Sequence, residues 1–154
     1  MAAAFGAAGA RVALLDIDEV SVIERADQLR ANGTTAKGVV CDITDFADCD
    51  RAFQEVRTDL GPIDVLINNA GLTHRSAFAD TDLEVYRRVM EVNYFGALHC
   101  TKAALEDLIA QRGLIVTMSS IAGIAPLLGR TGYSGSKHAL HGLFGSLRSE
   151  LAPS

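Results

Sequence analysis

The sequence is poor in basic residues, in cysteine and in long apolar runs, and each shortage excludes a class of protein. Lysine and arginine number 14 against 19 acidic residues, whereas a nucleic-acid-binding protein shows a basic face or stripe. No apolar stretch approaches the ~18 residues of a membrane span. The cysteines Cys41, Cys49 and Cys100 are widely spaced and form no metal-ligand pattern. We therefore expect no nucleic-acid, membrane or metal site, and small reduced core cysteines in a cytoplasmic protein.

The length and composition are those of one globular domain. The chain has 154 residues, of which 49% are apolar and 21% charged, which is enough to bury a core. Residues 1–9 contain no basic segment before the first apolar run, so we expect no signal peptide. We treat residues 1–154 as a single domain without internal repeats.

Apolar runs and helical periodicity alternate along the chain. Four short runs are continuous rather than alternating, which is typical of strands buried on both faces of a parallel sheet: 12–15, 39–40, 65–67 and 114–116. Helices are predicted at 19–32, 45–60, 83–112 and 134–151, the last ending near Pro153. This order predicts an α/β domain with right-handed crossovers.

The predicted helices have apolar stripes that should face the core. The stripes are Val20, Ile23, Ala26 and Leu29, then Phe46, Cys49, Phe53, Val56 and Leu60, then Tyr86, Met90, Asn93, Ala97, Cys100 and Ala104. Thr81 and Glu84 have the spacing of a capping box. Asn93 is a polar amide in an apolar stripe and needs hydrogen-bond partners. It is either a structural asparagine bonded to nearby backbone or the holder of an ordered water, and the two are compatible.

Polar residues follow all four predicted strands, where ligands bind in open α/β sheets. Asp16 and Asp42 end the first two strands, and two longer polar sets follow the others, Asn68-Asn69-Ala70-Gly71 and Ser119-Ser120. One such residue would be an ordinary turn former. Four sets together predict a site along this edge of the sheet.

Tyr133 and Lys137 carry the sharpest chemical signal. Four residues apart on a predicted helix, they lie on one face, and a nearby ammonium favours the phenolate form of tyrosine over the phenol. Tyr133 is therefore a candidate general acid and base for a hydroxyl proton. By itself the spacing is common and more often marks a solvated helix pair.

Ser120 supports the catalytic interpretation because it stands thirteen residues before Tyr133, just after a predicted strand. A serine there can hydrogen-bond the oxygen that Tyr133 protonates; the alternative is a helix or turn cap. The segment 121–129 is unusually apolar for a loop and would suit one wall of a substrate pocket. His138 and His141 show no metal-ligand spacing and are expected on the surface.

In order and spacing, these marks resemble the short-chain dehydrogenase/reductase family over essentially all of the chain. They are Asp16, Asp42-Ile43, Asn68-Asn69-Ala70-Gly71, Asn93, Ser120 and Tyr133-x-x-x-Lys137. The resemblance implies a Rossmann-like doubly wound parallel sheet and an NAD(P)-dependent oxidoreductase that interconverts a secondary alcohol and a ketone by hydride transfer. It also implies a homodimer or homotetramer in the full-length form, because two of the predicted helices resemble those that pair subunits in the family.

The resemblance assigns catalytic roles to four residues. Tyr133 would exchange the proton and Ser120 would orient the substrate oxygen. Lys137 would stabilise the phenolate and hold the nicotinamide ribose, and Asn93 would support a water relay.

For the cofactor, the resemblance implies that Asp42 and Ile43 contact the adenine and that its path is lined by Asn69, Ala70 and Gly71. Asp16 ends its strand where a carboxylate can accept hydrogen bonds from a ribose 2′-hydroxyl and would repel a 2′-phosphate. The next residue, Ile17, offers no positive charge, so NAD is favoured over NADP. The neighbouring Asp18 better suits the cap of the following helix.

The sequence departs from the family at both ends. Members begin with a strand and a glycine-rich turn that holds the pyrophosphate, whereas residues 1–9 match the helix after that turn. That strand is central in the family's sheet. We therefore expect a gap of roughly 10 Å, or two unpaired edges, between the strands ending at Asp16 and Asn68. The family's C-terminal strands are also expected to be lacking.

Two other interpretations stay open. A catalytically incompetent fragment, acting only as an assembly or binding module, would explain the missing glycine-rich turn. A receiver-like α/β binding domain would explain the strand-end aspartates but not the serine, tyrosine and lysine. The enzyme is the leading interpretation, with a small and hydrophobic alcohol or ketone as substrate.

Overall fold

Strands and helices alternate along the chain. A computed structural model describes residues 1–152, so the predicted stop near Pro153 lies outside it. In order, the elements are α1 (Ala2–Ala7), β1 (Val12–Asp16), α2 (Glu19–Ala31), β2 (Ala36–Val40), α3 (Phe46–Leu60), β3 (Val65–Asn68), η1 (Phe78–Asp80), α4 (Leu83–Met90), η2 (Glu91–Phe95), α5 (Gly96–Ala110), β4 (Leu114–Thr117), η3 (Ile121–Gly123) and α6 (Thr131–Leu151). All four predicted strands are present. Within residues 1–152, no helix combines the length and apolar character needed to cross a membrane.

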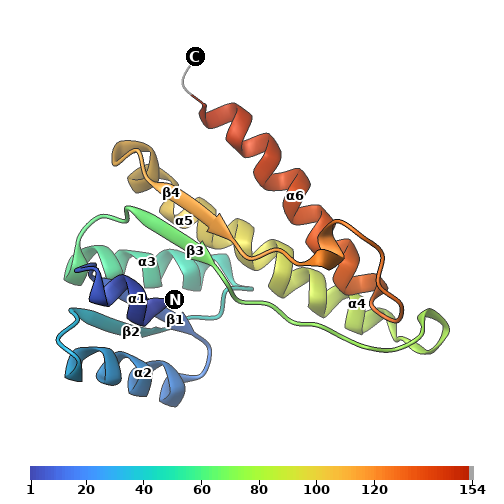
Figure 1. Cartoon of the computed structure of the whole chain (residues 1–154), viewed down its shortest axis with the longest axis horizontal. Helices are drawn as coiled ribbons and strands as arrows, with labels where there is room; N and C mark the ends of the chain where they lie inside the picture. Colours follow the sequence, from blue (N-terminus) through green and yellow to red (C-terminus); the bar gives the residue numbers. More distant parts are fainter. Residues whose placement is uncertain (153–154) are drawn as a thin grey trace.

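The four strands form two separate parallel pairs. β1 pairs with β2, with Val12 opposite Ala36, and β3 pairs with β4, with Val65 opposite Leu114. Within residues 1–152 no hydrogen-bonded ladder joins β1 to β3, which confirms the expected break between these strands. In Figure 1 the β1–β2 pair and the β3–β4 pair are drawn apart, and α6 extends away from the second pair.

The strands are less covered than the sequence predicts. Every residue of β1 is half-buried or exposed, and β3 and β4 both begin with an exposed residue. The prediction of strands buried on both faces is therefore wrong for β1 and for β4, neither of which has a buried residue. The chain exposes 9311 Å², whereas a compact monomer of this mass exposes about 7,500 Å².

The main core lies where β2 and β3 pack against α3 and α5. Its buried members are Val39, Cys41, Cys49, Ala52, Phe53, Val56, Leu66, Cys100, Ala103, Ala104 and Leu108. From the predicted stripe of α3, Cys49, Phe53 and Val56 belong to this core, Leu60 is buried outside it, and Phe46 is exposed. At its border, an ion pair between Arg57 and Asp107 joins α3 to α5, with 2.7 Å between Nε and Oδ2. Gly61 ends α3 with a φ of 88°, as its position after the stripe predicts.

The buried face of α2 is rotated from the predicted one. Val22 is buried together with Ala26 and Leu29, whereas Val20 and Ile23 are exposed. The reason is a close approach of β2, because a Cβ at Gly38 would lie only 2.6 Å from the Val22 carbonyl oxygen.

The predicted start of the long helix at Leu83 is confirmed, whereas its capping box and the predicted start of the last helix are wrong. The residue that precedes α4 is Asp82, and Thr81 forms no capping box because its hydroxyl donates to the Ala77 carbonyl at 2.7 Å. The last helix, α6, begins at Thr131, three residues earlier than the apolar pattern predicts. The missing capping box and the early start of α6 both depend on contacts outside the helix, which periodicity does not report.

The long predicted helix is continuous but changes its winding at Asn93. α4 and α5 are joined by η2, a π-helical segment over Glu91–Phe95. Such segments are rare and frequently occur at functional sites. The buried face includes Asn93, Ala97, Cys100 and Ala104, as predicted, whereas Tyr86 and Met90 are half-buried.

The three cysteines, distant in the sequence, lie in one core cluster as free thiols. A hydrogen bond with Cys49, followed by burial, raises the pKa of Cys41 far above its usual range. A hydrogen bond with Cys100, together with burial, raises the pKa of Cys49 to about 12. Burial disfavours the thiolate, so the thiols of Cys41 and Cys49 stay protonated in the folded chain.

Because the unfolded thiols titrate near ~8.5, we expect the free energy of unfolding to fall as pH rises above about 9. The folded state then holds protons that the unfolded state releases, up to the folded pKa of Cys49, about 12. The thiols of Cys41 and Cys49 each lower the free energy of unfolding by about 1.4 kcal/mol per pH unit in this range. Urea unfolding between pH 8 and 10.5 measures the slope. Cys49→Ala should make the fall of the unfolding free energy with pH less steep, and an unchanged slope in that variant would contradict the prediction.

Candidate functional site

Two of the predicted strand-end residues line one hollow. Asp16, at the end of β1, and Asn69, after β3, border a cavity of about 500 Å³ together with Leu14, Leu15 and residues of α2. β1 and β3 both belong to an alternating series of strands and helices, in which the strands run parallel. Their carboxyl ends therefore lie at the same edge of the sheet. The structure therefore brings these two predicted residues together although 53 positions separate them in the sequence.

The carboxylate of Asp16 remains available at this hollow. Its Oδ1 accepts one hydrogen bond from the backbone N–H of Asp18 at 3.1 Å, and the residue is exposed. Asp18 caps α2, as predicted, by accepting from Ser21 N at 3.1 Å and from the Ser21 hydroxyl at 2.8 Å. These hydrogen bonds lower the pKa of Asp18. The two neighbouring carboxylates thus differ in role, because Asp18 caps α2 whereas Asp16 faces the hollow.

Asp42 and Ile43 are fixed by their own neighbourhood. Asp42 Oδ1 accepts from the backbone N–H and hydroxyl of Thr44, at 2.9 and 2.7 Å. Ile43 packs on α5, because a Cβ at Gly96 would lie 2.5 Å from its Cδ1, and its carbonyl accepts from His99 Nδ1 at 2.9 Å. Both side chains are half-buried, and these contacts hold the turn against α5.

Two residues that sequence reasoning missed hold the same turn. Asp48 Oδ2 accepts from the backbone N–H of Asp42 at 2.8 Å, and its Oδ1 accepts from Arg51 Nε at 2.8 Å. Arg51 also donates to the Val40 carbonyl at 2.6 Å. The Asp42 N–H, followed by the guanidinium, holds the pKa of Asp48 below its usual value. An Asp and an Arg three apart on a helix gave no signal beyond an ordinary surface pair.

Asn93 holds the segment that follows β3. Only 1% of Asn93 is exposed, and its Oδ1 accepts from Leu72 N at 2.7 Å. Its Nδ2 donates to the Leu72 carbonyl and to Ser136 Oγ, both at 2.9 Å. The observed contacts of Asn93 are therefore those of a structural asparagine that bonds nearby backbone. A Cβ at Gly71 would lie 3.2 Å from Asn93 Oδ1, so the chain passes close to this amide.

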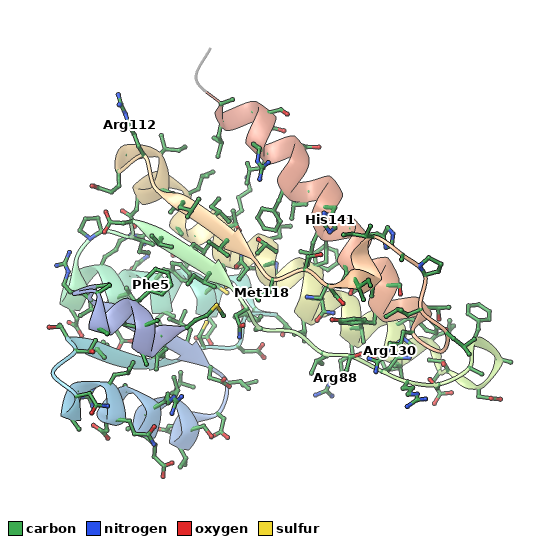
Figure 2. All side chains as sticks on the ribbon, in the orientation of Figure 1. Phe5, Arg88, Arg112, Met118, Arg130 and His141 are labelled. Carbon is green, nitrogen blue, oxygen red and sulfur yellow. The ribbon has the colours of Figure 1, made fainter. Side chains whose placement is uncertain are left out.

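Lys137 is buried beside the same glycine. Only 5% of it is exposed, and its Nζ donates to the Met118 carbonyl, just after β4, at 2.7 Å. A Cβ at Gly71 would lie 3.6 Å from this Nζ. Asn93, Lys137 and Gly71, from three distant parts of the sequence, therefore meet between the end of β3 and α6. Met118, at the end of β4, is labelled in Figure 2.

Tyr133 lies one turn before Lys137 on α6, as predicted. Lys137 Nζ lies 5.7 Å from the centre of the Tyr133 ring, and the Arg130 guanidinium lies 6.0 Å from it. The ring is half-buried, so its face meets two cations while part of it reaches solvent.

Ser120 stands at the start of η3, after β4. Its Oγ accepts from Ala122 N at 3.2 Å, so Ser120 caps this turn, which was the alternative to a substrate contact. No hydrogen bond joins it to Tyr133 within residues 1–152. Because the oxygen accepts in this contact, the hydroxyl hydrogen remains able to donate. The predicted apolar loop does present exposed Ile121, Ile124 and Leu128.

Two histidines were predicted on the surface, and a third makes a contact that the sequence did not predict. His138 and His141 are exposed, as expected, and His141 Nε2 lies 2.7 Å from Ser119 Oγ. His74 is half-buried and contacts the start of α6, which sequence reasoning missed. Its position three residues after Gly71, in the segment that follows β3, was the available signal.

Comparison with known proteins gives the relatives of the chain. The sequence family described as short chain dehydrogenase matches residues 1–154. "Dehydrogenase/reductase SDR family member 7" of Homo sapiens is 45% identical over 112 residues, covering 72% of this chain and 33% of that protein. "Dehydrogenase/reductase SDR family member 7B" of Rattus norvegicus is 38% identical over 158 residues, covering 97% of this chain and 48% of that protein. The chain thus spans half or less of the length of these curated relatives.

Solved structures share the fold. Actinorhodin polyketide ketoreductase with NADPH superposes with a TM-score of 0.93 at 32% identity, covering 98% of this chain and 59% of that one. A short chain dehydrogenase/reductase from Burkholderia phymatum in complex with NAD gives 0.87 at 26% identity, covering 91% and 50%. The fold is therefore Rossmann-like α/β, with the four strands in two parallel pairs.

Proposed function

The chain belongs to the short-chain dehydrogenase family, and on that premise we propose that it forms part of an oxidoreductase that interconverts a secondary alcohol and a ketone with NAD(H). One observation carries this proposal. Tyr133 and Lys137 lie one turn apart on α6, with the Lys137 ammonium 5.7 Å from the Tyr133 ring and close to Gly71. An acid–base group and a buried cation thus meet beside the segment proposed to line the cofactor's path.

The residues present fit a nicotinamide dinucleotide. Asp16 offers an exposed carboxylate at the hollow it shares with Asn69, which suits a ribose hydroxyl. Lys137 has three N–H donors and uses one on Met118, so two remain for the second ribose. Ala70 and Gly71 would line the path between these points, and Asp42 with Ile43 would border the adenine.

The proposed chemistry divides between cofactor and protein. The nicotinamide, when bound, supplies or accepts the hydride. Tyr133 donates its phenolic proton to the substrate oxygen during reduction and takes it back during oxidation. Lys137 stabilises the phenolate, and Ser120 donates its free hydroxyl hydrogen to the same substrate oxygen. The role of Asn93 in a water relay rests on the lone pair of Oδ1 that its bond to Leu72 leaves open.

We expect the chain to bind NAD more tightly than NADP, and Asp16→Ser to reverse the preference. The substitution removes a charged acceptor for the 2′-hydroxyl and the repulsion of a 2′-phosphate, so NAD binding should weaken by about tenfold or more. Calorimetry of the purified chain with NAD and NADP measures both dissociation constants, with circular dichroism on the same sample. Asp18→Asn removes the same charge two residues away and should leave the preference unchanged. Equal affinity for both cofactors in the unaltered chain would remove Asp16 from this role.

The wider functional proposals rest on less specific features. Exposed Ile121, Ile124 and Leu128 support a hydrophobic alcohol or ketone as substrate. The free cysteines suit the cytoplasm as location. A homodimer or homotetramer is proposed for the full-length protein.

An assembly module without activity is the second candidate. It is favoured by the exposed Phe46 and Phe95, whose ring centres lie 5.8 and 6.5 Å from that of His99 on α5. Light scattering of the chain, together with the calorimetry, separates the two candidates, because a module would associate without binding NAD.

A further inference from the structure

The helix that carries Tyr133 begins without a cap from its own sequence. α6 starts at Thr131, and Arg130 before it makes no side-chain capping hydrogen bond. The first N–H groups of a helix have no partner within the helix and need an acceptor from elsewhere. The acceptor here is His74 Nε2, at 3.1 Å from Gly132 N and 3.4 Å from Tyr133 N. A side chain from the segment after β3 thus contacts the backbone of Tyr133 itself.

The hydrogen-bond roles fix the tautomer of His74. Thr81 Oγ1 donates to the Ala77 carbonyl at 2.7 Å, so Ser76 Oγ donates to Thr81 Oγ1 at 2.5 Å. Ser76 Oγ is left to accept from His74 Nδ1, 3.3 Å away, which places the ring hydrogen on Nδ1. Nε2 keeps its lone pair, as its two N–H partners require. The neutral Nδ1–H form therefore satisfies every member of the chain of hydrogen bonds.

Packing holds the imidazole in this place. Its ring lies edge-on to the ring of Tyr86 on α4, with 5.6 Å between centres. A Cβ at Gly132 would lie 3.0 Å from Nε2, so the helix start approaches the ring closely. Next to it, Arg130 Nη1 donates to Thr73 Oγ1 at 2.5 Å and ties the same turn to the same segment. Figure 2 shows Arg130 at this end of α6.

We propose that His74 is a positioning residue, whose neutral imidazole caps α6 and so fixes the place of the Tyr133 hydroxyl. The inference rests on the proposed role of Tyr133 as proton donor. Without the cap, the first turn of α6 loosens and displaces Tyr133. Lys137 lies one turn further in and stays bonded to the Met118 carbonyl. Loss of the cap therefore lowers kcat and leaves cofactor binding unchanged.

The test compares His74→Phe with His74→Gln in the whole chain. Phenylalanine keeps a ring beside Tyr86 but offers no acceptor, whereas the glutamine Oε1 extends about as far as Nε2 and can accept. His138→Phe is the matched control, because His138 is an exposed histidine of α6. Hydrogen exchange of residues 131–137, followed by mass spectrometry, reports the cap, and residues 46–60 of α3 report global stability. Reduction of cyclohexanone by NADH gives kcat and KM.

We expect His74→Phe to accelerate exchange in residues 131–137 by about tenfold and to lower kcat by about tenfold or more at unchanged KM for NADH. His74→Gln should restore both, and His138→Phe should change neither. Unchanged exchange in His74→Phe, equal acceleration in residues 46–60, or no rescue by glutamine would overturn the inference. If neither the unaltered chain nor the full-length protein that contains it reduces a ketone, the proposed function fails, while exchange and its rescue still decide whether His74 holds Tyr133.

Discussion

Replacing Tyr133 with phenylalanine is expected to lower ketone reduction by about a thousandfold, with the dissociation constant for NAD unchanged. The substitution removes only the phenolic hydroxyl, and the ring can keep its place 5.7 Å from the Lys137 ammonium. The proton must then come from water, which is neither positioned nor activated by Lys137. Steady-state rates with NADH and either cyclohexanone or 2-octanone, together with calorimetry of NAD binding, measure the two quantities.

Ser134→Ala is the matched control for this prediction. Ser134 is the next residue of α6, and within residues 1–152 its buried hydroxyl has no hydrogen-bond partner. Its removal should therefore leave the rate unchanged. A Tyr133→Phe chain that retains a tenth or more of the activity would exclude Tyr133 as the proton donor. An equal loss in Ser134→Ala would instead point to a disturbed helix.

Asn93→Leu is expected to lower the free energy of unfolding by about 3 kcal/mol or more. Leucine has nearly the same size but leaves the N–H and carbonyl of Leu72 without their present partners and removes the donor to Ser136 Oγ. Asn93 is 1% exposed, so water cannot replace these contacts without opening the site. Urea unfolding followed by circular dichroism measures the change, provided that the transition is two-state.

An exposed asparagine provides the comparison. Asn32 follows α2, and its Nδ2 donates to the Gln28 carbonyl at 2.9 Å in an exposed position. Asn32→Ala should change the free energy of unfolding by less than about 1 kcal/mol, because water can satisfy the freed carbonyl. If Asn93→Leu were as mild, the hydrogen bonds to Leu72 would not be a main support of this segment.

The residues proposed for the site were predictable where the signal is local. Tyr133 and Lys137 needed only a helix and a spacing of four. Asp16 and Asn69 needed only the rule that strand ends meet at one edge, and the hollow they share agrees with it. The break between β1 and β3 was likewise predictable, because the family order places an additional strand between them.

Other features could not be predicted because they depend on side chains meeting across the fold. The rotation of α2 follows from the close approach of β2 at Gly38. The early start of α6 follows from an imidazole in a different segment. Ser120 was weighed as a substrate contact or a turn cap, and the sequence alone gave no means to see that its oxygen caps η3 while its hydrogen stays free.

The sequence by itself determined the order of strands and helices and the family, and it placed Tyr133 and Lys137, the proposed acid–base pair, on one helix. These properties follow from short-range patterns, because the period of the apolar residues, the turn residues and the spacing along a helix each involve residues a few positions apart. Only the tertiary structure decided which polar groups satisfy one another. Asn93 reaches Leu72 across 21 positions and His74 reaches Tyr133 across 59. Hydrogen bonds need a donor and an acceptor within about 3 Å at the right angle, and packing of the whole chain sets that distance.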